Sequence, residues 1–236
     1  EPDVSPIQLQ GPKSKDIMVK IFGNEILELK YYWFKKFKLG NINLLISRTG
    51  WSSEFGYEMF LLKTSDGDEL YETLMQEGKD LGLHPGHTST IRRIEGGMLS
   101  YHSDMDINTN PFELGLDKFI DLEKSFDFVG KDALIKIKKL GIQRKQVGLI
   151  IECEKLKGPN TKKWGIFKNQ QRIGQVTSAV YSPRLEQNIA LAMVDIEYSD
   201  INTSLKIKID DNLVDAKITV KPFFDPNKLI AKKSSI

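Results

Sequence analysis

The sequence predicts an α+β fold followed by a small antiparallel β-barrel or sandwich. Helix and strand patterns are mixed as far as Leu140, and short alternating strands separated by turn residues follow from Gln146. The chain has 236 residues, 40% of them hydrophobic, which is enough for one large domain or two modest ones with a real core. We therefore expect a first domain over residues 1–142 and a second over residues 143–236.

The first elements follow from apolar spacing and from the residues that begin and end helices. Residues 4–10 are expected to form a strand, and Pro12 then starts a helix that Gly23 ends. Two strands follow, the second of which is the apolar, β-prone stretch 43–47. A further strand over residues 57–62 resumes after a polar loop.

Three helices are expected in the rest of the first domain. Asp66 and Asp68 lead a helix that Gly82 terminates, because acidic residues favour a helix start and glycine favours its end. Another helix begins near Thr88, and residues 130–140 form a short lysine-rich helix.

The second domain is expected to contain six short strands with alternating apolar residues. They cover residues 147–153, 164–167, 172–180, 188–196, 204–209 and 215–220. The turn sequence Asp210-Asp211-Asn212 separates the last two strands. Cys153 falls on the same strand face as Leu149 and Ile151, which indicates a core residue and not a catalytic thiol.

Composition excludes several classes of protein. The 34 basic and 32 acidic residues give a net charge of +2 without a long run of either sign, so neither nucleic acid nor a membrane is an expected partner. One cysteine cannot form an internal disulfide bond, and no apolar stretch has membrane-spanning length. A reducing, cytoplasmic setting is the expected location, and no signal peptide is evident.

The most informative stretch for function runs from Arg48 to Phe60 and reads RTGWSSEFGYEMF. Alternation along its second half puts Glu58 and Phe60 on one strand face and Tyr57 on the other. A carboxylate beside aromatic rings can accept two hydrogen bonds from a planar heterocycle such as a pterin or a purine. The alternative is a hairpin with core aromatics and a solvated Glu58.

A second stretch, Thr90 to Asp106, reads TIRRIEGGMLSYHSDMD. Together the two stretches resemble the glycine-cleavage T-protein family of folate-dependent aminomethyltransferases. The resemblance extends over the whole chain through the segments NPFELGL, FVGKDAL, GQVTSAVYSP, NIALAMV and KPFFDP. Among the branches of this family, the sequence most resembles the demethylases that move a methyl group from dimethylsulfoniopropionate to tetrahydrofolate.

The resemblance implies a ferredoxin-like or split α+β folate-binding portion before the barrel, and it implies roles for single residues. Glu58 would recognise the pterin with Arg93 assisting, and Trp51 stands where T-proteins usually have a tyrosine. A structural ion pair is the alternative for Glu58 and Arg93. Arg92 cannot share a pocket with Arg93, because adjacent helix residues point about 100° apart. Helix packing is the better reading of Glu95.

Tyr57, Phe60, Tyr101 and Asp104 are the candidate substrate-pocket residues, with core packing or capping as their alternatives. Phe60 replaces a tyrosine that the demethylases would use to hold substrate. Tyr31, Tyr32 and Trp33 are further rings for a cage around a cationic donor, since one cation–π contact contributes only about 0.5–2 kcal/mol.

A metal site is not expected. His84, His87 and His102 with Asp104 and Asp106 could be combined on paper, but the implied one-carbon transfer needs no metal. In the implied reaction, tetrahydrofolate N5 attacks a carbon on a cationic sulfonium or amine donor.

The carboxylate that assists the reaction belongs to an amino-terminal third that this chain is expected to lack. No catalytic residue is therefore assigned. A lipoyl carrier protein would be a partner of a true T-protein. The alternatives are the folate module of a dimethylglycine or sarcosine dehydrogenase, and a non-catalytic folate-binding protein.

Overall fold

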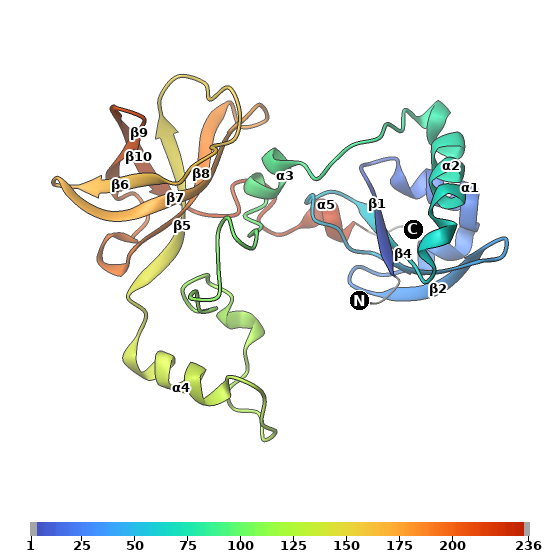
Figure 1. The fold of residues 1–236 in the computed structure, drawn as a ribbon, viewed down its shortest axis with the longest axis horizontal. Helices are drawn as coiled ribbons and strands as arrows, with labels where there is room; N and C mark the ends of the chain where they lie inside the picture. The colour runs from blue at the N-terminus through green and yellow to red at the C-terminus, as the bar shows by residue number, and fades with distance from the viewer. Residues whose placement is uncertain (1–3, 234–236) are drawn as a thin grey trace. The chain divides into compact units, whose positions relative to one another are not determined.

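An antiparallel sheet of four strands, in the order β1-β4-β3-β2, is the centre of the first of two structural units (Figure 1). The computed structural model describes residues 4–233. The first unit comprises the chain up to residue 89 and from residue 225 onward, and the second comprises residues 90–224. Its strands are β1 (Ser5–Gln10), β2 (Phe34–Leu39), β3 (Ile42–Ser47) and β4 (Gly56–Leu61).

Helices α1 (Ser14–Phe22) and α2 (Gly67–Gly78) pack against each other and cover one face of this sheet. Gly23 ends α1 with a φ of 74°, in the region that favours glycine. Short 3₁₀ turns extend the helices at Asn24–Glu28, Thr64–Asp66 and Lys79–Leu81, and a short helix, α5 (Leu229–Lys232), lies near the carboxyl end. The predicted start and end of α1 and the predicted start of α2 are confirmed to within two residues, whereas α2 ends at Gly78 and Gly82 ends the 3₁₀ turn that follows it.

The alternation predicted for residues 57–62 is confirmed in β4. Tyr57, Met59 and Leu61 are buried in the core beneath the two helices, whereas Glu58 and Phe60 lie on the opposite face and are partly exposed. Burying an apolar side chain of this size contributes about 1.5–3 kcal/mol, so the core face determines which way the strand is turned. Glu58 is thereby presented on the open face of the sheet.

The second unit contains a closed antiparallel barrel in the order β10-β5-β8-β7-β6-β9 (Figure 1). Its strands are β5 (Arg144–Glu152), β6 (Trp164–Lys168), β7 (Gln171–Ser182), β8 (Gln187–Asp195), β9 (Ser204–Ile209) and β10 (Asn212–Thr219). Of the two predicted architectures, a barrel or a sandwich, the barrel is correct, and each of its six strands overlaps a predicted segment, with bounds that differ by up to three residues. The predicted turn at Asp210-Asp211 connects β9 to β10.

Three further helical segments precede the barrel in this unit. Helix α3 (Thr90–Glu95) packs on β7 and β8 through Ile94, which is fully buried against Val180 and Leu191. A 3₁₀ turn covers Asp117–Phe119, another covers Ile196–Tyr198 within the barrel, and α4 (Lys131–Leu140) buries none of its side chains. The α+β fold with an antiparallel barrel is thus confirmed.

Cys153 lies at the end of β5, half-buried and packed against the barrel core. Burial raises the pKa of its thiol, which keeps the sulfur protonated and unreactive at neutral pH. Its predicted core position is confirmed in part, because the side chain contacts the core but is not fully buried.

Candidate functional site

Glu58 lies between two neighbours on the open face of the first unit's sheet, with Gln8 opposite it on β1 and Ser47 opposite it on β3. The Thr49 hydroxyl donates a hydrogen bond to Glu58 Oε2, and the Ser47 and Thr49 hydroxyl oxygens are 2.5 Å apart. These bonds hold the carboxylate in one orientation, while its partial exposure leaves it able to accept further hydrogen bonds.

The loop from residue 48 to residue 56 is closed around the side chain of Gln10. Gln10 Nε2 donates to the carbonyl oxygens of Thr49 and Tyr57, each at 3.3 Å, and the Ser52 hydroxyl donates to Gln10 Oε1 at 2.7 Å. A Cβ atom on Gly50 or Gly56 would collide with this amide. The two glycines that bracket the loop therefore leave room for the Gln10 amide in this position.

Arg48 belongs to the site, although the sequence alone predicted no role for it. Its side chain is buried, and its guanidinium donates to the carbonyl oxygens of Gly56 at 2.7 Å and Ala231 at 2.8 Å. The guanidinium carbon also lies 3.8 Å from the centroid of the Phe55 ring. Burial lowers the pKa of Arg48 from its ordinary value. A charged residue directly after the apolar stretch 42–47 was the available signal.

Trp51 lines a cavity of about 570 Å³ in the first unit, together with the outer edge of β1. Tyr71 of α2 and the loop residues His84 and His87 contribute to the same cavity. Its lining combines aromatic, imidazole and amide groups, which suits a flat, polar heterocycle. Trp51 is half-buried there and keeps part of its ring accessible.

The other aromatic candidates of this unit occupy three different environments. Phe60 is two residues from Glu58 on the open face of β4, and Tyr57 is fully buried on the core face, with its ring 5.7 Å from that of Phe55. The Tyr31 and Tyr32 rings are 4.2 Å apart, and Lys30 Nζ lies 5.0 Å from the Trp33 ring centroid. The assignment of Tyr57 to a substrate pocket stays a prediction.

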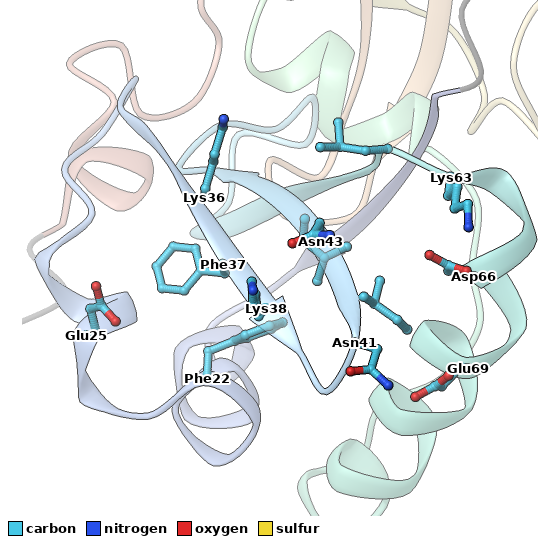
Figure 2. Close-up of a pocket in the computed structure, with 13 residues that line it drawn as sticks. Phe22, Glu25, Lys36, Phe37, Lys38, Asn41, Asn43, Lys63, Asp66 and Glu69 are labelled. Atoms are coloured by element: carbon cyan, nitrogen blue, oxygen red, sulfur yellow. The ribbon is translucent and has the colours of Figure 1, made fainter.

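A larger cavity of about 900 Å³ lies around the β2–β3 turn of the first unit (Figure 2). Lysines and acidic residues contribute to its lining in equal number: Lys36, Lys38, Lys63, Glu25, Asp66 and Glu69. Because the charges balance, the cavity shows no preference for the charge of a ligand, and we assign no function to it.

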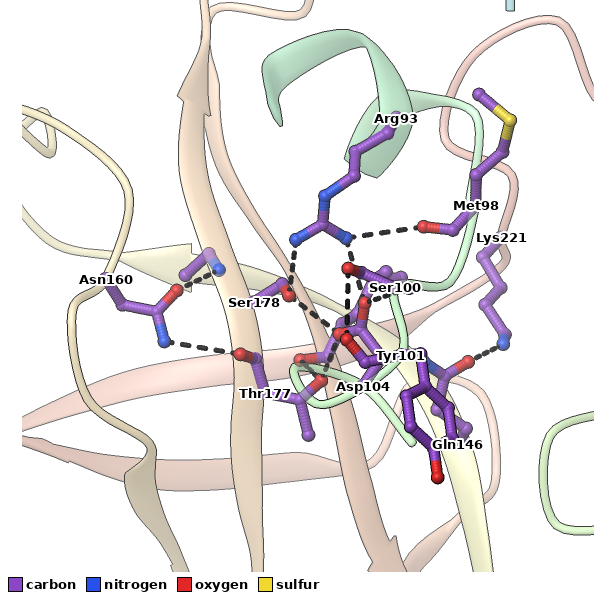
Figure 3. A network of polar contacts seen from close by, with 12 residues as sticks. Arg93, Met98, Ser100, Tyr101, Asp104, Gln146, Asn160, Thr177, Ser178 and Lys221 are labelled. Atoms are coloured by element: carbon purple, nitrogen blue, oxygen red, sulfur yellow. Dashed lines mark hydrogen bonds and ion pairs between the residues drawn. The ribbon is translucent and has the colours of Figure 1, made fainter. Parts of the chain in front are cut away.

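Arg93 and Asp104 form a buried ion pair in the second unit (Figure 3). Arg93 Nη1 donates to Asp104 Oδ2 at 2.8 Å, and Arg93 Nη2 donates to the Ser178 hydroxyl at 2.8 Å. Asp104 Oδ2 also accepts the Ser100 N–H at 2.9 Å. The second carboxylate oxygen accepts the hydroxyls of Thr177 at 2.6 Å and Ser178 at 2.7 Å.

The two adjacent hydroxyls on β7 reach one carboxylate because the strand is irregular at this point. Successive residues of a regular strand point to opposite faces. The pairing register of β7 with β8 shifts between Val176 and Ser178, which indicates a β-bulge at Thr177. The bulge turns the Thr177 and Ser178 side chains toward the same Asp104 oxygen.

Tyr101 and Glu95 complete the candidate residues of the second unit. Tyr101 is 54% exposed and its ring lies 4.5 Å from that of His102, so it is accessible for contact with a ligand. Glu95 is buried, and its carboxylate accepts the Ser182 hydroxyl at 2.6 Å. Glu95 therefore has the packing role that was the better reading.

No group of three or more His, Cys, Asp or Glu side chains within residues 4–233 is arranged to hold a metal ion. His84 and His87 line the cavity beside Trp51, whereas His102 and Asp106 belong to the second unit. Over the same described range, no helix has both the length and the apolar character needed to cross a bilayer.

Comparison with known families gives two matches. The family model of the GCVT N-terminal domain matches residues 1–124, and that of the glycine cleavage T-protein C-terminal barrel domain matches residues 144–225. The second match coincides with the closed barrel.

Two curated relatives show the same level of similarity. The chain is 33% identical over 224 residues to the dimethylsulfoniopropionate demethylase DmdA of Ruegeria pomeroyi, covering 95% of this chain and 60% of that protein. It is also 33% identical over 230 residues to an aminomethyltransferase of Caldanaerobacter subterraneus, covering 95% of this chain and 59% of that protein. The chain thus spans about 60% of the length of these relatives.

A solved structure supports the same fold. The glycine cleavage system aminomethyltransferase T from Bartonella henselae aligns with a TM-score of 0.79 at 21% identity, over 94% of this chain and 60% of that one. The resemblance predicted from the motifs is confirmed by these matches, and the chain belongs to the glycine cleavage T-protein family.

Proposed function

We propose that this protein takes part in a tetrahydrofolate-dependent one-carbon transfer, in which a methyl or aminomethyl carbon moves from a cationic sulfonium or amine donor to tetrahydrofolate. Membership of the T-protein family supports the reaction class. The observation that carries the folate assignment is the oriented, partly exposed Glu58 carboxylate on the open face of β4. Identity is 33% to both a demethylase and an aminomethyltransferase, so the proposal covers both donor classes.

Glu58 has the chemistry that a pterin requires. A carboxylate accepts the two parallel hydrogen bonds that a ring N–H and an exocyclic amine donate, and this pairing is stronger than one between neutral groups. The Thr49 hydroxyl holds one oxygen and so fixes the plane in which the pterin edge would lie. In this proposal Trp51 stacks on the heterocycle, and Arg93 is a further folate-binding candidate.

The chain's own residues bind and orient the reactants and do not attack them. Holding two reactants in contact is worth several kcal/mol of the barrier, and charge stabilisation contributes more. Phe60 presents an apolar ring beside Glu58, and Tyr101 and Asp104 are the proposed pocket residues of the second unit. Tetrahydrofolate supplies the N5 nucleophile when bound, and no catalytic residue is assigned to this chain.

The setting proposed for this activity is the cytoplasm. A small-molecule donor is the expected partner, and a lipoyl carrier protein becomes a partner if the donor is an aminomethyl group. We propose no nucleic-acid or membrane partner.

The test of the folate assignment is the Glu58→Ala substitution in this chain, with 5-formyltetrahydrofolate as a stable probe and calorimetry as the readout. Two charge-assisted hydrogen bonds of about 1.5–3 kcal/mol each are lost, so the affinity is expected to fall by roughly 100-fold or more. The expected cause is the loss of pterin pairing, because Glu58 is partly exposed and its removal leaves the core intact.

Glu69→Ala is the matched control, since Glu69 is a carboxylate of the same unit that lines the cavity at the β2–β3 turn. Its affinity for 5-formyltetrahydrofolate should equal that of the unchanged chain. If Glu58→Ala and the unchanged chain bind 5-formyltetrahydrofolate with equal affinity, the pterin assignment is disproved. Loss of affinity in the Glu69 variant alone would move the folate site to the cavity of Figure 2.

A further inference from the structure

Lys221 is a lysine of the second unit that has no carboxylate partner within residues 4–233. Its ammonium group donates to the side-chain oxygen of Gln146, and it forms no ion pair with any described carboxylate (Figure 3). An ammonium group has three N–H donors, so two remain for another acceptor. The side chain is partly buried.

Asp104, the acidic group that favours the charged form of Lys221, cannot serve as that acceptor. Asp104 contributes to the electrostatic environment of Lys221, but its two oxygens already accept four hydrogen bonds, from Arg93, Ser100, Thr177 and Ser178. Four lone-pair sites are the capacity of a carboxylate. The positive charge of Lys221 is therefore left without a matching anion among the described residues.

Gln146 supplies a second donor beside it. Its side chain is 2% exposed, and its Nε2 has no hydrogen-bond partner among the described residues. The bond from Lys221 to the amide oxygen determines the orientation of the amide, so Nε2 must face away from the lysine stem. A buried amide donor without a partner is destabilising, which indicates that an acceptor completes the arrangement.

We propose that Lys221 and Gln146 form a binding site for the carboxylate group of a ligand. Lys221 supplies the charge and Gln146 Nε2 the second donor, a combination that matches an anionic oxygen pair. The inference builds on the proposed function only for the source of the carboxylate, which is either the glutamate tail of tetrahydrofolate or the carboxylate of a sulfonium donor such as dimethylsulfoniopropionate.

Burial supports this assignment independently of the hydrogen bonds. It lowers the pKa of Lys221 to about 8, with the neighbouring Lys145 adding to the effect and Asp104 opposing it. A bound carboxylate would favour the charged form and raise the pKa again. Removing the charge should therefore stabilise the free protein and weaken ligand binding, a pair of effects that a purely structural lysine would not show.

The binding test compares Lys221→Met and Lys221→Arg, with Lys217→Met as the control because Lys217 is exposed on β10. Affinities are measured by calorimetry for 5-formyltetrahydrofolate, for 6-methyltetrahydropterin, which carries no carboxylate, and for dimethylsulfoniopropionate. Lys221→Met should weaken binding of the carboxylate-bearing source by about 10-fold and leave binding of 6-methyltetrahydropterin unchanged. Lys221→Arg should retain most of the affinity, and Lys221→Met should raise the Tm of the free protein.

A second measurement is independent of folate. Acetylation of Lys221 by acetic anhydride is followed by mass spectrometry in propionate and in chloride at equal ionic strength. Propionate should protect Lys221 and not Lys217. Gln146→Glu should abolish this protection, because the new carboxylate would occupy the lysine itself.

Equal acetylation in propionate and chloride, together with unchanged affinities in Lys221→Met, would overturn the carboxylate site. If the unchanged chain binds no folate but propionate protects Lys221, the proposed function fails while the carboxylate site stands. If folate binds normally to Lys221→Met and propionate gives no protection, the carboxylate site fails while the proposed function stands.

Discussion

At the scale of single residues, charged side chains in this protein differ in how much of their hydrogen-bonding capacity is used. Asp104 is buried, and its two carboxylate oxygens accept four hydrogen bonds. Glu58 and Lys221 each have a single described side-chain partner and are partly exposed. Glu58 and Lys221 are expected to contact ligands, because a ligand can form the hydrogen bonds that these side chains do not make within the protein.

Phe60→Tyr tests the resemblance to the demethylase branch at a single atom. The new hydroxyl would project from the open face of β4 beside Glu58, where it can hydrogen-bond a sulfonium donor. One hydrogen bond contributes about 0.5–1.5 kcal/mol, so affinity for dimethylsulfoniopropionate should rise by roughly 2- to 10-fold in calorimetry.

Phe34→Tyr is the control for this change, because Phe34 is an exposed aromatic residue on β2 of the same sheet. It should leave the affinity unaltered. A Phe60→Tyr protein with the affinity of the unchanged chain would mean that the analogy with the demethylases is wrong.

At the scale of elements, two irregularities position the candidate residues. The loop between β3 and β4 is closed by the Gln10 amide of β1, which connects three neighbouring strands of one sheet. The bulge in β7 brings Thr177 and Ser178 to one carboxylate. A regular β7 would not produce the second arrangement, because the side chains of successive residues would alternate between faces.

Gly56→Ala tests the closure of the loop. The added methyl group collides with the Gln10 amide, so the free energy of unfolding should fall by about 1–3 kcal/mol in urea denaturation. Gly86→Ala is the control, because no atom lies within 4 Å of the position of its Cβ and its backbone is not in the left-handed region.

The double variant Gly56→Ala with Gln10→Ala identifies the cause. If the collision with Gln10 is responsible, the double variant should lose at least about 1 kcal/mol less than the sum of the single changes. Additive losses would show that Gly56 is required for some other reason.

At the scale of the whole molecule, each unit has its own core, and the polar network of the second unit connects its helix to its barrel. Arg93 comes from α3, Asp104 from the turn after it, and Ser178 from β7. The apolar contact of Ile94 with the barrel strands adds to the same junction. The network is therefore expected to determine whether α3 and the barrel unfold together.

Asp104→Asn tests this connection. The amide would place N–H donors against those of Arg93 and Ser100 and would remove the carboxylate charge that faces the buried guanidinium, so the second unit should lose about 3 kcal/mol or more. Trp164 in the barrel core reports its unfolding by fluorescence in a chain in which Trp33 and Trp51 are replaced by phenylalanine.

Asp127→Asn is the control, because Asp127 is an exposed residue of the same unit. This substitution should change the stability of the second unit by less than about 0.5 kcal/mol. A similar stability for the Asp104 and Asp127 variants would show that the buried network does not join α3 to the barrel.

The sequence by itself determined the elements and the orientation of β4. Period-two alternation predicted that Glu58 and Phe60 share a face, and Gly23 predicted a helix end that the structure has. The motifs also identified the family. These features are local, because they depend on residues within a few positions of one another.

Only the tertiary structure decided which side chains complete the polar groups. Arg48 finds its partner carbonyl at Ala231, Asp104 finds the hydroxyl of Thr177, and Lys221 finds the amide of Gln146. These partners are 183, 73 and 75 residues apart, and no periodicity within one strand or helix can specify such a pairing. Chain topology and burial select them, because a buried charge must be satisfied by whatever the fold brings within hydrogen-bonding distance.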